Sequence, residues 1–315
     1  MRAGLALVAL TLGTSGCFVS LGGLGALRGE RPLRETTLEG EGRAKILLVD
    51  VSNVITDLPT KHAFGLLEEE STVERVHAEL KKAADDGRVK AIVLRVNSPG
   101  GGVTASDDVY GEIVRFKREQ KVPVVAAFGD VAASGGYYVA VACDQIYANP
   151  GTLTGSIGVI MQLANVEQLM KKVGVDYVVV KAGAFKDIGN IARPMTGDER
   201  RVLQTLLDDV HGQFIDAVAK GRKLPREQVV QFADGRVFSG TQALSLKMVD
   251  ALGGLEDAVN AAAKLANIPT PPAVERPRRR FSFLDLLRNE IGLPAPGSLL
   301  RPGLPLFKTP LYLMD

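Results

Sequence analysis

The sequence predicts an α/β protein that is built on a mostly parallel sheet. Apolar runs typical of buried strands occupy residues 45–51, 91–96 and 122–128, and patterns typical of amphipathic helices separate them. Strand and helix patterns alternate at roughly forty-residue spacing, which favours crossover helices between parallel strands. Glycine-rich turns follow the second and third strands, at residues 99–102 and 134–136. Because both turns lead from a strand into a helix, we expect them at the same edge of the sheet, where sites form in such folds.

The expected helices have local start signals, and the longest ones have apolar stripes. Ser71 and Glu74 have the spacing of a capping box at the start of the first helix. A further strand is expected at residues 175–181. The domain is predicted to span residues 45–268, with a proline- and arginine-rich tail at residues 269–315 outside the core. The helical patterns cover residues 71–82, 106–120, 137–142, 168–173 and 198–222, with two or three shorter helices between residues 224 and 265.

The composition narrows the classes of function. The chain has 315 residues, of which 46% are hydrophobic and 23% charged, and its formal net charge is +2. That is an ordinary globular balance, and no basic patch interleaved with aromatic residues points to nucleic acid. The three histidines and two cysteines show no metal-ligand spacing. We therefore expect no metal, no cofactor and no disulfide framework.

The first residues have the pattern of an export signal. Arg2 precedes an apolar stretch, which ends in three small residues directly before Cys17. This order resembles a lipobox and predicts that residues 1–16 are a lipoprotein signal peptide and that Cys17 is lipidated. The alternatives are plain secretion and an N-terminal membrane anchor, the latter because no charge occurs at residues 3–27. The expected location is the bacterial cell envelope, with the domain outside the cytoplasm and residues 17–44 as a tether.

Ser134 lies in the turn between the third strand and the helix that follows it. Its neighbours in the chain are small: Ala133 precedes it directly, and Gly135 and Gly136 follow it. A side chain exposed at a sharp turn with small neighbours is the geometry of a nucleophile elbow. The N–H groups at the start of the helix could also hold a developing oxyanion. The alternative is that Ser134 caps an ordinary helix, and this stretch alone leaves both interpretations open.

A serine nucleophile needs a base to take its proton. No histidine occurs between His77 and His211, and His211 lies inside the long helix beside two aspartates, as on a solvated face. A buried lysine can serve instead when desolvation removes its charge. The lysines of the short helix at residues 168–173 are expected to be solvated. The residues alone leave Lys181 and Lys186 as alternatives, although Lys186 has smaller and more apolar neighbours.

Four motifs follow one another along the chain. They are LRVNSPGGG at residues 94–102, GDVAASGGYY at 129–138, TGSIGV at 154–159 and FKDI at 185–188. Together they resemble the SppA, or protease IV, family of bacterial signal peptide peptidases over roughly residues 45–265. Since GDVAASGG occurs once, the chain resembles the short, single-copy form of that family.

The resemblance implies a fold and a set of roles. The fold would be ClpP/crotonase-like, with repeated β-β-α units, and catalysis would use a Ser-Lys dyad. By motif position, Ser134 would be the nucleophile, Lys186 the general base and Ser156 the residue that orients the lysine. The backbone N–H groups of Gly101 and Gly135 would form the oxyanion hole. The resemblance also implies a homo-oligomeric ring in which neighbouring protomers complete each active site.

Taken together, these features predict a membrane-associated serine endopeptidase that degrades cleaved signal peptides through an acyl-enzyme. The alternatives are an inactive crotonase-fold scaffold at the membrane and an acyl-CoA enzyme, which would need neither Ser134 nor Lys186. The tail adds a further hypothesis. Residues 304–315 are apolar and contain proline, so they are either a self-ligand of the peptide groove or a disordered or ring-packing segment.

Overall fold

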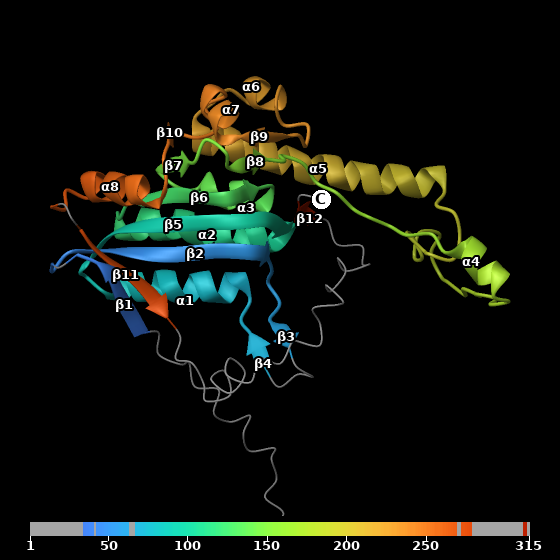
Figure 1. Cartoon of the computed structure of the whole chain (residues 1–315). Helices are drawn as coiled ribbons and strands as arrows, with labels where there is room; N and C mark the ends of the chain where they lie inside the picture. The colour runs from blue at the N-terminus through green and yellow to red at the C-terminus, as the bar shows by residue number, and fades with distance from the viewer. Residues whose placement is uncertain (1–33, 41, 63–66, 270–271, 279–310, 314–315) are drawn as a thin grey trace, which may run out of the picture. The chain divides into compact units, whose positions relative to one another are not determined.

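The computed structural model of the chain describes residues 34–40, 42–62, 67–269, 272–278 and 311–313 (Figure 1). The predicted signal peptide, Cys17 and most of the predicted tail lie outside these residues. The strands are β1 (Arg34–Glu39), β2 (Lys45–Ile55), β3 (Thr60–His62), β4 (Leu67–Glu69), β5 (Val89–Gly102), β6 (Val124–Ala133), β7 (Gln145–Ala148), β8 (Leu153–Gly155), β9 (Val237–Ser239), β10 (Ala251–Leu252), β11 (Ala273–Arg278) and β12 (Leu311–Leu313). The helices are α1 (Thr72–Asp85), α2 (Val103–Gln120), α3 (Gly135–Ala140), α4 (Glu167–Lys172), α5 (Gly197–Arg222), α6 (Arg226–Val230), α7 (Gly240–Ser245) and α8 (Leu255–Leu265). In this part of the chain, no helix has both the length and the apolar character to cross a membrane.

The strands form one large mixed sheet whose central strands are parallel, together with the separate β3–β4 hairpin. The main order is β1-β11-β2-β5-β6-β7-β10, and β12, β8 and β9 join it from the side. The pairings from β11 through β2, β5 and β6 to β7 are all parallel. Antiparallel pairing occurs where β1 joins β11 and where β12 joins β5. The predicted α/β class with a mostly parallel sheet is confirmed.

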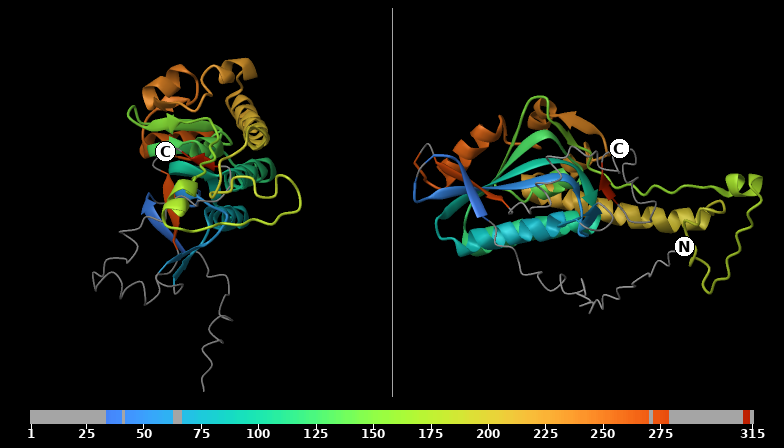
Figure 2. Two further views of the ribbon diagram at one scale, coloured as in Figure 1. Left: turned by 90° about the vertical axis from the view of Figure 1, so that its right-hand side faces the viewer. Right: turned by 60° about the horizontal axis from the view of Figure 1, so that its bottom comes forward.

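Both faces of the central strands are buried under helices. Alternate residues of β2 show this: Leu47 and Val49 pack into a core with residues of α1, α2 and α3, whereas Ile46 and Leu48 pack with α8. Figure 2 shows α1 and α2 side by side along the sheet, and Figure 1 shows α8 at its other face. A strand that is covered on both faces has a continuous apolar run, which is why residues 45–51 showed no alternation of polar and apolar residues.

The local signals at the start of α1 are confirmed. The Ser71 side chain accepts a hydrogen bond from the Glu74 N–H at 3.1 Å, and the Glu74 carboxylate accepts one from the Ser71 N–H at 3.3 Å. This is a capping box at the expected position.

The prediction of a strand at residues 175–181 is wrong. These residues form no strand and lie in a long extension between β8 and α5, which contains α4 (Figure 1). Val178 and Val180 are exposed, and none of the α4 residues is buried. The apolar run that predicted a buried strand therefore has no sheet to join within the described residues of one chain.

Helix α5 forms as expected, but only its second half packs against the core. Its buried apolar residues begin at Val210, whereas Val202 and Leu206, which belong to the predicted apolar stripe, are exposed. The first half, with the α4 segment beside its N-terminus, extends beyond the end of the sheet (Figure 1).

Three of the described strands lie outside the predicted domain boundaries, and one of them, β12, lies in the predicted tail and pairs with β5. Strand β1 falls in residues assigned to the tether, and β11 in residues assigned to the tail. They pair with each other, and β11 also pairs with β2. The sheet therefore begins before residue 45 and continues after residue 268.

Candidate active site

Ser134 occupies a strained turn at the carboxyl end of β6. It has φ 52° and ψ −121°, a combination that is uncommon for a residue with a side chain. It stands at the N-cap position of α3, yet its side chain makes no capping hydrogen bond. The residue is fully buried in the single chain, and its hydroxyl has no hydrogen-bond partner among the described residues. Strain together with an unused hydroxyl favours a nucleophile over a helix cap.

The second glycine-rich turn lies directly beside Ser134, as expected for two turns at one sheet edge. Strand β5 runs parallel to β6 and ends in this turn, where Gly100 has φ +107°. A Cβ atom added to Gly135 would lie 3.1 Å from the Gly101 nitrogen. The backbones of the two turns therefore touch where the oxyanion donors Gly101 and Gly135 were predicted, and glycine at position 135 permits this contact.

Two buried serines that the sequence analysis missed support the same turn. The Ser98 hydroxyl accepts a hydrogen bond from the Gly100 N–H at 3.1 Å and donates one to the Asn53 carbonyl. The Ser106 hydroxyl donates to the Gly102 carbonyl at 2.9 Å. A serine two residues before a turn glycine is a signal for this local hydrogen bond, which could have identified Ser98.

Ser156 lies at the end of the strand next to Ser134. Strand β8 pairs in parallel with β6, with Ala133 opposite Gly155, and the Ser134 N–H donates to the Gly155 carbonyl at 2.8 Å. Both serines therefore follow directly after paired residues of neighbouring strands. Ser156 has φ 51° and is 8% exposed. The structure thus brings together the turns that carry Ser134, Ser156, Gly101 and Gly135.

His211 does not lie on a solvated face, as its helical position had suggested. Its ring nitrogen Nε2 is 3.1 Å from the carbonyl oxygen of Ile157, the residue after Ser156, and the side chain is half-buried. The helix position alone could not reveal this, because the contact depends on how α5 crosses the loop after β8. No hydrogen bond joins His211 to Ser134, so a serine–histidine pair is absent from the part of the chain that is described.

Lys186 is not brought to Ser134 within one chain. It is exposed on the extension between α4 and α5, and no hydrogen bond joins it to Ser134 or Ser156. The rival lysine is occupied: the Lys181 ammonium pairs with the Asp187 carboxylate and donates to the Ala184 carbonyl at 2.9 Å. The Lys181 ammonium is thus engaged by partners within the extension itself and not directed to Ser134. This difference favours Lys186.

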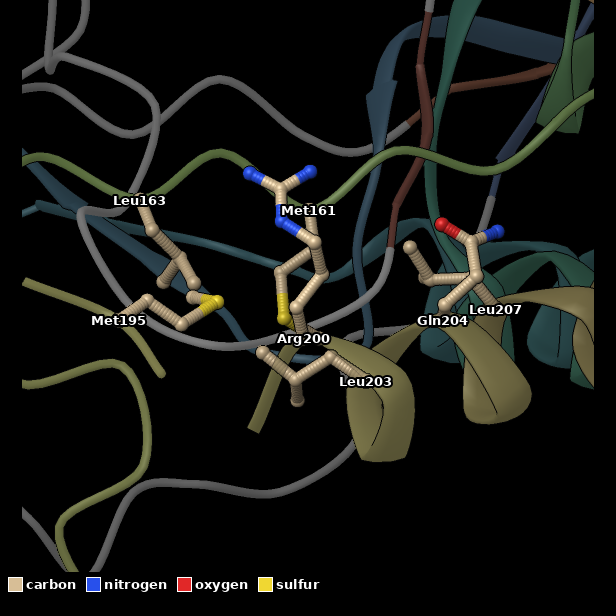
Figure 3. A pocket seen from close by; sticks show the side chains of 7 residues that line it. All are labelled: Met161, Leu163, Met195, Arg200, Leu203, Gln204 and Leu207. Carbon is tan, nitrogen blue, oxygen red and sulfur yellow. The ribbon is translucent and has the colours of Figure 1, made fainter. Parts of the chain in front are cut away.

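The extension leaves an apolar pocket against α5 (Figure 3). Its volume is about 330 Å³. The methionines Met161 and Met195 face the leucine side chains of the helix across it (Figure 3). The lining residues are Met161, Leu163, Met195, Arg200, Leu203, Gln204 and Leu207. No cluster of side chains suited to a metal ion occurs in the described residues.

Comparison with known proteins gives a consistent result. Residues 116–269 match peptidase family S49. The chain is 46% identical to a "Putative protease" of Synechocystis over 62% of this chain and 69% of the relative. It is 35% identical to the "Putative signal peptide peptidase SppA" of Enterococcus faecium, over 78% of this chain and 71% of the relative. It is also 35% identical to "Protease 4" of Haemophilus influenzae, over 73% of this chain and 36% of the relative. With the fold and the serine turn described above, these similarities show that the chain belongs to peptidase family S49, the serine peptidases of ClpP/crotonase-like fold.

Proposed function

We propose that this serine peptidase uses a Ser134–Lys186 dyad to degrade signal peptides at the cell envelope. The observation that carries the proposal is the strained, buried Ser134 with an unpartnered hydroxyl beside the Gly101 and Gly135 backbone. A hydroxyl at such a turn has an oxyanion site within reach and needs only a base.

The proposed reaction has two stages. The Ser134 oxygen attacks the peptide carbonyl while its proton passes to the neutral amine of Lys186, and the N–H groups of Gly101 and Gly135 stabilise the oxyanion. The resulting ammonium returns the proton to the leaving nitrogen as the C–N bond breaks, which leaves an acyl ester on Ser134. Water, deprotonated by the same lysine, then hydrolyses the ester. Ser156, at the end of β8, orients the lysine.

We place the peptide substrate along the turn at the end of β5. There β12 pairs antiparallel with the backbone of residues 100–102, with Tyr312 opposite Gly101. An extended segment of chain thus lies where a substrate would add a strand, and backbone hydrogen bonds of this kind bind peptides with little dependence on sequence.

We propose that Lys186 reaches Ser134 from a neighbouring copy of the chain. Three features support this: Lys186 is exposed, the Ser134 hydroxyl has no hydrogen-bond partner among the described residues of its own chain, and the extension that carries Lys186 exposes an apolar surface. This extension surface consists of Val173, Val175, Tyr177, Val178, Val180 and Phe185. A ring of identical subunits would cover it and would desolvate the lysine at the same time.

The substrate and the location are proposed from the sequence and the relatives. The Enterococcus relative is named for signal peptides. An apolar peptide that is left in a membrane requires a peptidase that is attached to the same membrane. A lipidated Cys17 would provide that attachment.

The full chain in detergent, with a labelled signal peptide as substrate, tests the dyad. We expect Ser134→Ala and Lys186→Ala each to abolish cleavage, because the nucleophile or its base is lost. If two copies build each site, assemblies mixed from the two variants regain activity at roughly one site in four, as random pairing predicts. Activity that survives either substitution contradicts the dyad, and mixtures without activity contradict the neighbouring copy. A parent chain without peptidase activity would favour the scaffold.

The attachment is tested separately. Cys17→Ser should move the protein from the membrane fraction to the soluble fraction while cleavage of a soluble peptide continues. If Cys17→Ser stays in the membrane fraction, an N-terminal anchor is favoured instead.

A further inference from the structure

We infer that Arg193 is a positioning residue for Lys186. It fastens the turn that carries Lys186 to the N-terminus of α5, and it neutralises the carboxylate beside the lysine. This inference rests on the proposed role of Lys186 as the base.

The turn around Lys186 is short and has little other support. The Lys186 N–H donates to the Gly183 carbonyl at 3.2 Å, and the Ile188 N–H donates to the Phe185 carbonyl at 3.0 Å. Residues 181–186 are all exposed, so apolar packing within the chain does not hold the turn. Asp187, whose side chain is 12% exposed, is its first well-covered residue. The position of Lys186 therefore depends on what holds Asp187.

The Arg193 guanidinium joins Asp187 to α5. Its Nε donates to the Asp187 carboxylate at 2.9 Å, and its Nη1 donates to the Glu199 carboxylate at 2.9 Å, with a second bond from Nη2 to Glu199. A planar guanidinium can bridge two carboxylates in this way, whereas an ammonium cannot reproduce the geometry.

Glu199 is a rigid end point for this bridge. Its side chain is 3% exposed and forms a capping box with Thr196 at the start of α5. The Glu199 carboxylate accepts the Thr196 N–H at 2.8 Å, and the Thr196 hydroxyl accepts the Glu199 N–H at 3.2 Å. The chain of contacts thus runs from a capped helix through Arg193 and Asp187 to the residue next to Lys186.

The same contacts balance charge beside the lysine. Lys181 and Arg193 supply two positive charges, and Asp187 and Glu199 two negative ones. Hydrogen bonds from Arg193, then from Lys181, hold the pKa of Asp187 well below its usual range. Those from Arg193 and the Thr196 backbone lower the pKa of Glu199 to about 2. Both carboxylates therefore stay charged at neutral pH. Without Arg193, the Asp187 charge would favour the ammonium form of a neighbouring lysine, which cannot accept the serine proton.

Variants of the full chain in detergent separate the two roles of Arg193. For Arg193→Gln we expect kcat to fall by up to about 100-fold with KM little changed, because a misplaced base slows chemistry more than binding. The acid-side fall of kcat/KM should also move to higher pH. Arg193→Lys keeps the charge but not the bridge, so the pH profile should stay near that of the parent while kcat remains low. Arg193→Gln combined with Asp187→Asn should likewise restore the pH profile but not kcat.

A matched control is Arg226→Gln. This change removes an exposed ion pair near the other end of α5, in which the Arg226 Nε lies 2.7 Å from the Asp216 carboxylate. It should change neither kcat nor the pH profile. If Arg193→Gln keeps the parent kcat and profile while Lys186→Ala is inactive, the inference fails and the dyad stands. If Lys186→Ala is as active as the parent, both fail together. A loss of kcat that only matches a loss of folded protein, measured by circular dichroism, also contradicts a positioning role.

Discussion

A side chain at Gly135 would collide with the turn that it faces. Its Cβ atom would lie 2.4 Å from the Ser106 hydroxyl oxygen as well as close to Gly101. Neither neighbour can retreat freely, because Ser106 is fully buried and Gly101 is part of β5. The close approach of the two backbones, which sets the proposed oxyanion site, therefore depends on this glycine.

We predict that Gly135→Ala reduces kcat by about 100-fold or more, the usual effect of losing an oxyanion donor. Steady-state kinetics on the folded variant measure this. Gly111→Ala is the control, since its Cβ would meet nothing within 4 Å and it should keep full activity. Equal activity of the two variants would show that the turns do not need this contact.

Glu79 on α1 gives the fold a pH dependence that is independent of catalysis. Its side chain is nearly buried, and one carboxylate oxygen has no hydrogen-bond partner among the described residues. Burial raises its pKa from 4.5 to about 7, against the opposing charge of Arg75. The folded state binds the Glu79 proton more tightly than the unfolded state does. Protonation of Glu79 therefore contributes its full stabilisation below the pKa of this carboxyl in the unfolded chain, and that stabilisation is lost as the pH rises to about 7.

We expect the free energy of unfolding to fall by on the order of 3 kcal/mol over this pH range. Glu79→Gln, whose side chain stays neutral, should abolish this fall. Melting temperatures at about pH 5 and about pH 8 test this. The variant should be more stable than the parent at the higher pH. Exposed Glu119→Gln is the control and should keep the parent's pH dependence. If the melting temperature of Glu79→Gln depends on pH as that of the parent does, the prediction is contradicted.

At the scale of residues, the sequence could place the proposed nucleophile and the glycine turns but not the proposed base. Ser134, Gly101 and Gly135 follow buried strands directly, so strand–turn–helix spacing predicted one sheet edge for them. Ser156 came only from the resemblance, and the resemblance also chose Lys186 over Lys181, which the residues alone had left as alternatives. The place of Ser156 depends on the pairing of β8 with β6, which no local pattern encodes. The preference for Lys186 over Lys181 depends on the Lys181–Asp187 ion pair, whose partners are six residues apart in a loop.

At the scale of elements, the errors concentrate in the extension. Residues 175–181 have the apolar run of a buried strand, and Val202 and Leu206 continue an apolar helix stripe. Both patterns indicate that a surface is apolar, but they do not indicate which molecule covers that surface. The core elements were predictable because strands such as β2 bury both faces inside one chain.

Strand β12 is the element whose function is most directly testable. It pairs with residues 100–102, where we place the substrate, so it should compete with added peptide. A chain that ends at residue 310 should therefore have a lower KM and the same kcat. A synthetic peptide with the sequence of residues 311–315 should restore the higher KM. If truncation leaves KM unchanged and the peptide does not inhibit, β12 is not a self-ligand.

At the scale of the whole molecule, the exposed first half of α5 should govern assembly. Val202 is 48% exposed and Leu206 is 45% exposed, and each directly precedes a leucine, Leu203 or Leu207, that lines the pocket of Figure 3. We predict that Val202→Asp combined with Leu206→Asp yields monomers by sedimentation, with an unchanged far-ultraviolet spectrum and no peptidase activity. Gln213→Asp adds one negative charge, half that of the double variant, at an exposed position of α5 and should assemble normally. Active monomers would show that one chain completes its own site.

The antiparallel pair β1–β11 has a mechanical consequence. Strand β1 lies within the residues assigned to the tether, and β11 lies within those assigned to the tail, so one antiparallel ladder joins these two segments to the sheet. A force applied to the chain ahead of β1 would act first on the backbone hydrogen bonds between β1 and β11, and it would reach β2 through β11 and through the connecting residues 40–44. The β1–β11 pair therefore lies between such a force and the central strands, so this pair would separate before the turns that carry Ser134 and Gly101 were displaced.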